Sequence, residues 1–482
     1  MRLLVRLLAS AALIQALGTA SALAQQTVGT PPIWFDTEDD FSQLRGTDSG
    51  APVEIDSGPG TATAADADAG DQPEEPGKAL RVSPQAAITD EEAQSAPPRK
   101  RKELDSGAYE PLGIRLGSFI LRPAIEFRTG YTTNAAGSPD AIASGTLTVA
   151  PDITLTSDWS EHELGFRLKG AYEYFTDTTV AADPTLYVEG NGRIDLPDDW
   201  ALRLKADYNY DTQSLDVLGY PVGADNPPGV NTFDGGATLD GAFGLVLVEL
   251  RGTATYTGYE DADLAGIEVD QSYRDNTFWS GAARIGYQIT PAVAPFVETQ
   301  LSTRRFQQPI DAFGYSRNSN GITIRGGLQY SADPVLKGEI ALGWHREDYV
   351  DAAYSSFDAP TIDASLIWSP SPLTQIAFTA STSVDPADDL TASSTLVYDL
   401  ALSAQRYIRE NFTLEGDISW QRQHYIGTEL SNYTYEAGVG ATWKINREAW
   451  LVGRLAQEYY VSAVPGGDYP TTTATIGIRF QR

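Results

Sequence analysis

The stretch FTLEGDISWQRQ, residues 412–423, alternates hydrophobic and polar side chains along its length. Leu414, Ile418 and Trp420 fall on one face of an extended chain, and Glu415 and Asp417 fall on the other. This period of two predicts a β-strand with one apolar and one charged face. Strands of soluble proteins are usually about 5 to 6 residues long, so the length here favours a strand that crosses a membrane.

The same pattern recurs throughout the chain after residue 113. Eighteen such segments are centred near residues 124, 149, 168, 190, 205, 237, 251, 282, 300, 324, 341, 362, 378, 399, 416, 438, 455 and 475. Single-chain bacterial outer-membrane barrels require an even number of strands. The sequence therefore predicts an all-β fold, a transmembrane antiparallel β-barrel of about eighteen strands.

The connections between these segments fall into two alternating classes. One class is short and rich in turn residues, as at 157–161, 290–292 and 408–411, and the other is longer and polar, as at 134–143 and 212–231. Tight periplasmic turns and longer external loops are typical of outer-membrane barrels. Because the strand number is even, we expect both ends of the barrel on the periplasmic side.

Aromatic residues are spaced as two membrane-interface girdles would require. Three pairs lie eight residues apart on one face of a segment, and these are Trp200 with Tyr208, Phe412 with Trp420, and Tyr435 with Trp443. A tilted membrane strand crosses in about 9 to 11 residues. Each pair therefore fits one aromatic residue at each lipid interface.

The amino-terminal region divides into a signal and a leader. Residues 1–24 carry two arginines before an apolar run ending in Ala-Leu-Ala, which predicts a cleaved secretory signal peptide. Residues 25–112 are acidic and rich in Ala, Asp, Gly, Pro and Ser, which predicts a disordered periplasmic leader. Residues 113–482 form the predicted barrel. The expected partners are outer-membrane lipid and lipopolysaccharide, and periplasmic export or envelope proteins that bind the leader.

Composition restricts the chemistry. The formal net charge of −31 argues against nucleic acid as a partner, and the absence of cysteine removes disulfides and thiolate chemistry. None of the three histidines lies in an obvious local Ser/His or Asp/His constellation, so we expect no catalytic residues, no cofactor and no enzyme activity. Acid clusters at 260–263 and 385–389 lack the ordered spacing of a calcium loop, and solvated loop charge is the favoured interpretation over calcium binding.

The start of the predicted barrel resembles a known family. Residues 117–126, GSFILRPAIE, followed by YTTN at 131–134, resemble the opening of the putative beta-barrel porin 2 type of outer-membrane protein. Residues 150–159, APDITLTSDW, resemble its second strand and tryptophan turn, and the similarity is clearest over residues 113–176. Thr132 and Thr133 stand where members often carry acidic residues. The resemblance implies an outer-membrane barrel, sometimes one that accompanies envelope polysaccharide export, and does not imply an enzyme.

The polar face of the strands predicts the pore lining. By parity the inward residues include Arg128, Arg167, Lys169, Arg203, Lys205, Arg251, Arg284, Arg304, Arg325, Glu298, Glu339, Glu415, Asp417, Glu436, Arg454 and Glu458. Such charges tolerate burial only when they are hydrated or paired, which predicts a wet interior. Barrels of sixteen to eighteen strands enclose an aqueous channel.

These features favour a porin-like channel for small hydrophilic solutes. A conduit for envelope polysaccharide export, a structural or adhesive barrel without flux, and a plugged lumen remain as alternatives. The longest external connection, 212–231, carries Asp216 and Asp225 beside apolar residues. We expect this connection either to fold inward as a constriction loop or to lie over the outer rim.

Overall fold

The fold is taken from a computed structural model of the chain, which describes residues 109–213, 228–264, 267–310, 314–332, 335–387 and 392–482. The predicted signal peptide, nearly all of the predicted leader, and Asp216 and Asp225 lie outside the described residues. Within the part of the chain that is described, no helix is long and apolar enough to cross a membrane.

Long β-strands make up most of the described chain. The first half of the wall contains β2 (Phe119–Thr132), β3 (Ser144–Ser157), β4 (Glu163–Phe175), β5 (Asp183–Asp195), β6 (Ala201–Thr212), β7 (Gly229–Phe243), β8 (Val246–Tyr259), β11 (Asn276–Tyr287) and β12 (Val293–Phe306). The second half contains β13 (Ser319–Ala332), β14 (Leu336–Tyr349), β15 (Phe357–Ser371), β16 (Thr374–Asp385), β17 (Thr395–Arg409), β18 (Phe412–Tyr425), β19 (Ser431–Lys444), β20 (Ala449–Val461) and β21 (Tyr469–Gln481). Each predicted segment centre lies within one of these eighteen strands.

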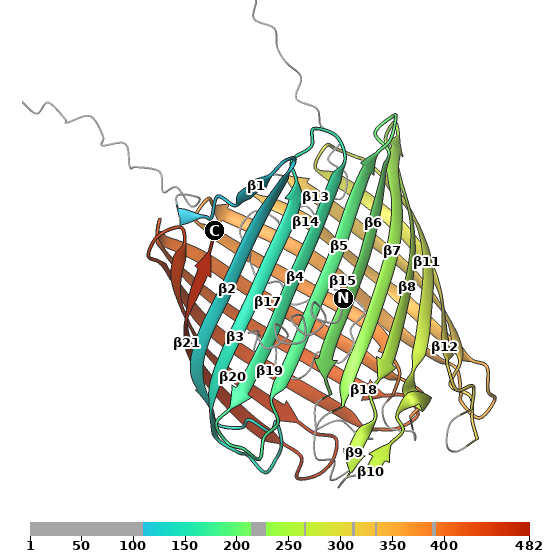
Figure 1. Cartoon of the computed structure of the whole chain (residues 1–482). Helices are drawn as coiled ribbons and strands as arrows, with labels where there is room; N and C mark the ends of the chain where they lie inside the picture. Colours follow the sequence, from blue (N-terminus) through green and yellow to red (C-terminus); the bar gives the residue numbers. More distant parts are fainter. Residues whose placement is uncertain (1–108, 214–227, 265–266, 311–313, 333–334, 388–391) are drawn as a thin grey trace, which may run out of the picture. The chain divides into compact units, whose positions relative to one another are not determined.

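The eighteen strands form a closed antiparallel barrel (Figure 1). Each strand pairs with the next one along the chain, and β21 pairs with β2, with Arg479 opposite Glu126. This pairing joins the first and last strands of the wall, as a sheet that crosses lipid requires. The prediction of an eighteen-stranded barrel is confirmed. A short strand, β1 (Ile114–Leu116), pairs with the start of β2 and is not part of the wall.

The two rims of the barrel differ in the length of their connections. The turn between β7 and β8 is only Gly244 and Leu245, and Gly244 has a φ of 63° that suits a tight turn. The connection between β8 and β11 holds a small hairpin, β9 (Ala262–Leu264) with β10 (Ile267–Val269), and a 3-10 helix, η2 (Ser272–Arg274). Both ends of the barrel lie at the rim of the short turns, and the hairpin lies at the other rim (Figure 1).

Side chains alternate between the two faces of the wall. Outward positions carry exposed large hydrophobic residues such as Val297, Leu301 and Trp443, whereas Glu298 between its outward neighbours is buried. Of the aromatic pairs predicted from the sequence, Tyr208, Phe412, Trp420, Tyr435 and Trp443 fall on outward positions of β6, β18 and β19, and Trp200 immediately precedes β6. The apolar surface therefore faces outward toward lipid, and the polar residues face the lumen.

Candidate functional site

The inner wall of the barrel gathers the charged residues of the strands. All predicted lining residues lie on the inward side of their strands, and these are Arg128, Arg167, Lys169, Arg203, Lys205, Arg251, Arg284, Arg304, Arg325, Glu298, Glu339, Glu415, Asp417, Glu436, Arg454 and Glu458. Direct cross-strand pairs fix this placement, since Arg284 faces Glu298 and Glu298 faces Arg325.

Glu298 of β12 is the centre of the largest ion-pair network. Its side chain is only 1 % exposed, and its two carboxylate oxygens accept from three arginines on three strands. Arg251 lies 3.0 Å away, Arg284 2.9 Å and Arg325 2.9 Å. Three cations around one buried carboxylate satisfy its lone pairs, and this local excess of positive charge must be balanced by other acids.

Acids on the neighbouring strands supply that balance. Arg284 donates to both oxygens of Glu339, at 2.7 and 3.0 Å, and Arg325 lies 2.9 Å from Asp363. The side chains of Glu339 and Asp363 are 32 % and 33 % exposed, and that of Arg251 is 37 % exposed. The network thus has a buried centre and a water-accessible edge that carries both signs of charge.

A second cluster lies on β18, β19 and β20. Arg454 donates to both oxygens of Asp417, at 2.6 and 2.9 Å, and to Glu436 at 3.2 Å. Glu415 and Glu458 lie on the same inward face of these strands. Acids outnumber bases at this group of five residues, so this side of the lumen has a negative local balance.

Most of the remaining lining residues also form ion pairs, some within one strand and some between neighbouring strands. Arg167 lies 3.5 Å from Asp152, and Arg128 lies 3.2 Å from Glu126. Lys205 lies 2.9 Å from Asp207 and 3.7 Å from Glu189, and Arg203 forms an ion pair with Asp240. Lys169 faces Asp152 directly across the β3–β4 pair. Charges of both signs therefore surround the lumen in small, mutually neutralising groups.

The connection between β16 and β17 contacts β14 and the connection between β12 and β13. Arg317 donates to the carbonyl oxygen of Ala387 at 2.7 Å, and the Tyr349 hydroxyl donates to Ser394 at 2.7 Å. Ala387 and Ala392 are buried. The sequence does not predict these contacts, and its candidate constriction loop is 212–231. A run of small residues, Ala392 to Ser394, is the only sequence signal that we recognise for the contacts.

The described edge of the predicted constriction loop is also buried. Gln213 accepts from Arg274 of η2 at 2.7 Å, and both side chains are buried, so the third and fourth long connections contact each other. Asp216 and Asp225 belong to the segment outside the described residues. Their role in a constriction stays a prediction.

One histidine does lie between a hydroxyl and a carboxylate. The Nδ1 atom of His345 is 2.8 Å from the Thr323 hydroxyl, and its Nε2 atom is 2.9 Å from Glu347. The sequence does not predict this arrangement, which arises because β13 and β14 place Thr323 directly opposite His345. In a serine-hydrolase triad the nucleophile contacts Nε2 of the histidine and the carboxylate contacts Nδ1. In this protein the hydroxyl contacts Nδ1 and the carboxylate contacts Nε2, so the arrangement is reversed. The absence of enzyme activity stays a prediction.

Among the described residues, no group of three or more His, Asp or Glu side chains is arranged to hold a metal ion.

A closed barrel with an apolar outer face and a charged inner face defines the class of outer-membrane β-barrel proteins. A family model, putative beta-barrel porin 2, matches residues 107–482, and the chain belongs to this family. The family resemblance of residues 113–176 is therefore confirmed and extends over the whole barrel. The protein is located in the outer membrane.

Solved structures with the same kind of fold have little sequence in common with this chain. OccAB2 of Acinetobacter baumannii is 12 % identical over 78 % of this chain and 99 % of its own, with a TM-score of 0.39. OpdK of Pseudomonas aeruginosa is 10 % identical over 75 % and 99 %, with a TM-score of 0.39. The siderophore receptor PirA of Pseudomonas aeruginosa is 9 % identical over 75 % and 80 %, with a TM-score of 0.36. A search of curated proteins finds no match.

Proposed function

We propose that the protein is a porin-like channel for the passive passage of small hydrophilic solutes across the outer membrane. The observation that carries this proposal is the water-accessible edge of the Glu298 network, where Arg251, Glu339 and Asp363 are each about one-third exposed on the inner face. Ionised groups keep such exposure only where water solvates them, so the wall is built to line an aqueous path.

The pore lining carries both positive and negative charges, and this influences which solutes pass. Pairing within each cluster neutralises most of the field at short range, which favours passage of polar solutes of either charge over tight binding of one ion. Residues 113–482 nevertheless contain 47 acids and 25 bases, a balance of −22. A negative mouth concentrates cations at low salt, and we expect a modest cation preference.

Conductance of the purified protein in planar bilayers tests the proposal. We expect discrete single-channel steps in 1 M KCl, and a reversal potential of cation sign across a tenfold salt gradient, measured against boiled protein. A protein that inserts, migrates as a folded barrel on gels and gives no current would contradict a passive channel and favour an export conduit or a structural barrel. Anion selectivity would contradict only the cation preference.

A further inference from the structure

The backbone pairing between β15 and β16 stops partway along the wall. It runs from the pair Ser371 and Thr374 at the short-turn rim to the pair Ala364 and Ala380, and it is the shortest ladder among the described wall strands. Beyond it, β15 continues to pair with β14 up to Phe357, and β16 continues to pair with β17 up to Asp385. The wall is therefore split along one seam, in the half next to the long connections.

Side chains replace the missing backbone partners along this seam. The Thr382 hydroxyl accepts the Ile362 N–H at 2.9 Å and lies 3.0 Å from the Ile362 carbonyl oxygen. The Tyr398 hydroxyl, from β17, donates to the Pro360 carbonyl oxygen at 2.8 Å and so reaches past β16. An unpaired backbone group costs several kcal/mol in lipid, so these contacts let the strands stay apart inside the membrane.

A proline occupies the position where the ladder would need a donor. If the register of Ala364 and Ala380 continued, Pro360 would stand opposite Val384. Proline has no N–H to donate. The Val384 carbonyl oxygen instead accepts from Arg304 of β12 at 2.7 Å, on the inner side. The end of β16 is thus held toward the lumen while β15 stays in the wall.

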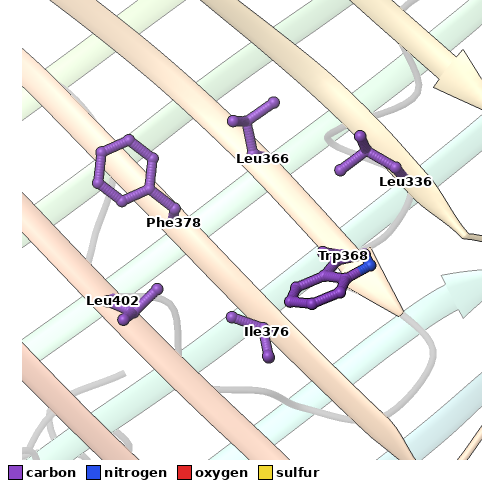
Figure 2. A pocket seen from close by; sticks show the side chains of 6 residues that line it. All are labelled: Leu336, Leu366, Trp368, Ile376, Phe378 and Leu402. Carbon is purple, nitrogen blue, oxygen red and sulfur yellow. The ribbon is translucent and has the colours of Figure 1, made fainter. Parts of the chain in front are cut away.

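An apolar hollow lies on the outer face of the same two strands. It has a volume of about 480 Å³, and Figure 2 shows its lining, which consists of Leu336, Leu366, Trp368, Ile376, Phe378 and Leu402. Leu366 is opposite Phe378 and Trp368 is opposite Ile376 in the β15–β16 ladder. Leu366 lies on the same outward face as Ile362, four residues along β15, so the hollow continues the line of the split. Its lining is almost entirely apolar, with the indole nitrogen of Trp368 as its one polar side-chain atom, and this suits an acyl chain.

We propose that the β15–β16 seam is a lateral binding portal for an acyl-chain amphiphile. The acyl chain lies in the apolar hollow and enters the split above it, and the polar head reaches the charged inner wall. The membrane supplies the occupant, because the hollow faces lipid on a strand surface that spans the outer membrane. The portal needs the wet lumen of the proposed channel, and it does not need passage of solutes through that channel.

Fluorescence quenching tests whether acyl chains reach the lumen at this seam. The chain has no cysteine, so Ser383→Cys gives a single labelling site on the inward face of β16 beside the split. Ser280→Cys, inward on β11 between two complete ladders, is the matched control. Both variants are labelled with bimane and placed in phosphatidylcholine vesicles. Stearate with a doxyl quencher close to its carboxyl head, the end that the proposal places at the inner wall, is then added.

We expect at least twofold stronger and saturable quenching at position 383 than at position 280. Tyr398→Phe, which removes the hydroxyl over Pro360, should widen the seam and raise quenching at 383. Pro360→Val, which restores a backbone donor, should lower it. Heat-modifiable migration on gels confirms folding of each variant. Equal quenching at both positions, or no response to either substitution, would overturn the proposal.

The same preparations separate this proposal from the channel proposal. If the protein conducts and quenching is equal at the two positions, the channel proposal is supported and the portal proposal is overturned. If quenching at position 383 is strong and saturable but the protein does not conduct, the portal proposal is supported and the passive-channel proposal is overturned.

Discussion

Arg304 of β12 donates to the carbonyl oxygen of Val384 of β16 at 2.7 Å. Three strands, β13, β14 and β15, separate these two strands in the wall. With about 4.8 Å between neighbouring strands, the distance along the wall is roughly 19 Å, farther than one side chain reaches. The end of β16 therefore lies inward of the wall at the long-connection rim.

Loss of the hydrogen bond from Arg317 to the β16–β17 connection should widen the pore at the long-connection rim. Arg317→Gln shortens the side chain that donates to Ala387, so we expect the β16–β17 connection to loosen and single-channel conductance to rise by roughly one half. Arg305→Gln is the control, because Arg305 lies on the outward side of β12 and binds the Ser319 carbonyl oxygen. Unchanged conductance in Arg317→Gln would show that this connection does not limit the current.

Glu298 should be more important for stability than for selectivity. Glu298→Gln leaves three arginines around a neutral buried side chain, and we expect a loss of about 3 kcal/mol in the free energy of unfolding, measured in urea. Glu339→Gln removes the same charge from a partly exposed site and should cost about 1 kcal/mol. Both should shift the reversal potential toward anions by a similar amount. Equal stability losses would contradict a special role for Glu298.

Acid should loosen two long connections through Asp351. The backbone N–H groups of Ala353 and Ser316 donate to Asp351, at 3.0 Å each, and these hydrogen bonds hold the pKa of its carboxyl below the ordinary 3.8. Because the folded pKa is lowered, the stabilisation is present above pH 3.8 and is lost as the pH falls through the folded value.

Amide hydrogen exchange measures this effect. The Ser316 and Ala353 amides should exchange faster in Asp351→Ala than in the unmodified protein at neutral pH, after correction for the intrinsic rate. The difference should vanish below the folded pKa. A difference that persists unchanged at pH 2 would mean that the carboxylate charge is not its cause.

A glycine in β14 should be essential for the pairing with β15. Gly338 has a φ of 130°, and a Cβ atom there would meet the Ser365 carbonyl oxygen and the Leu366 Cα atom. We expect Gly338→Ala to lower the free energy of unfolding by about 2 kcal/mol and to lower the temperature of the gel-mobility shift. Gly326→Ala is the matched control, since open space surrounds its Cβ position. Equal shifts in both variants would contradict the close-approach argument.

The sequence by itself determined the barrel and the face of each residue. Alternation with a period of two assigns Glu298 inward and Val297 outward without any knowledge of partners, because successive side chains of a strand point to opposite faces. Strand length and the alternation of short and long connections then indicated a membrane barrel with both ends at one rim. These properties depend on short stretches of sequence, so the alternation of residues and the lengths of strands and connections are enough to predict them.

Only the tertiary structure decided which inward charges meet and where the wall opens. Arg284 pairs with Glu339 although 55 residues separate them, because the register of β11 to β14 sets their relative height along the barrel axis. Likewise, the sequence shows that Pro360 removes one backbone N–H donor from its strand. It does not show that the Val384 carbonyl oxygen accepts from Arg304. Alternation fixes the face of a side chain, whereas the stagger between strands and the departure of β16 from the wall depend on every pairing around the closed sheet.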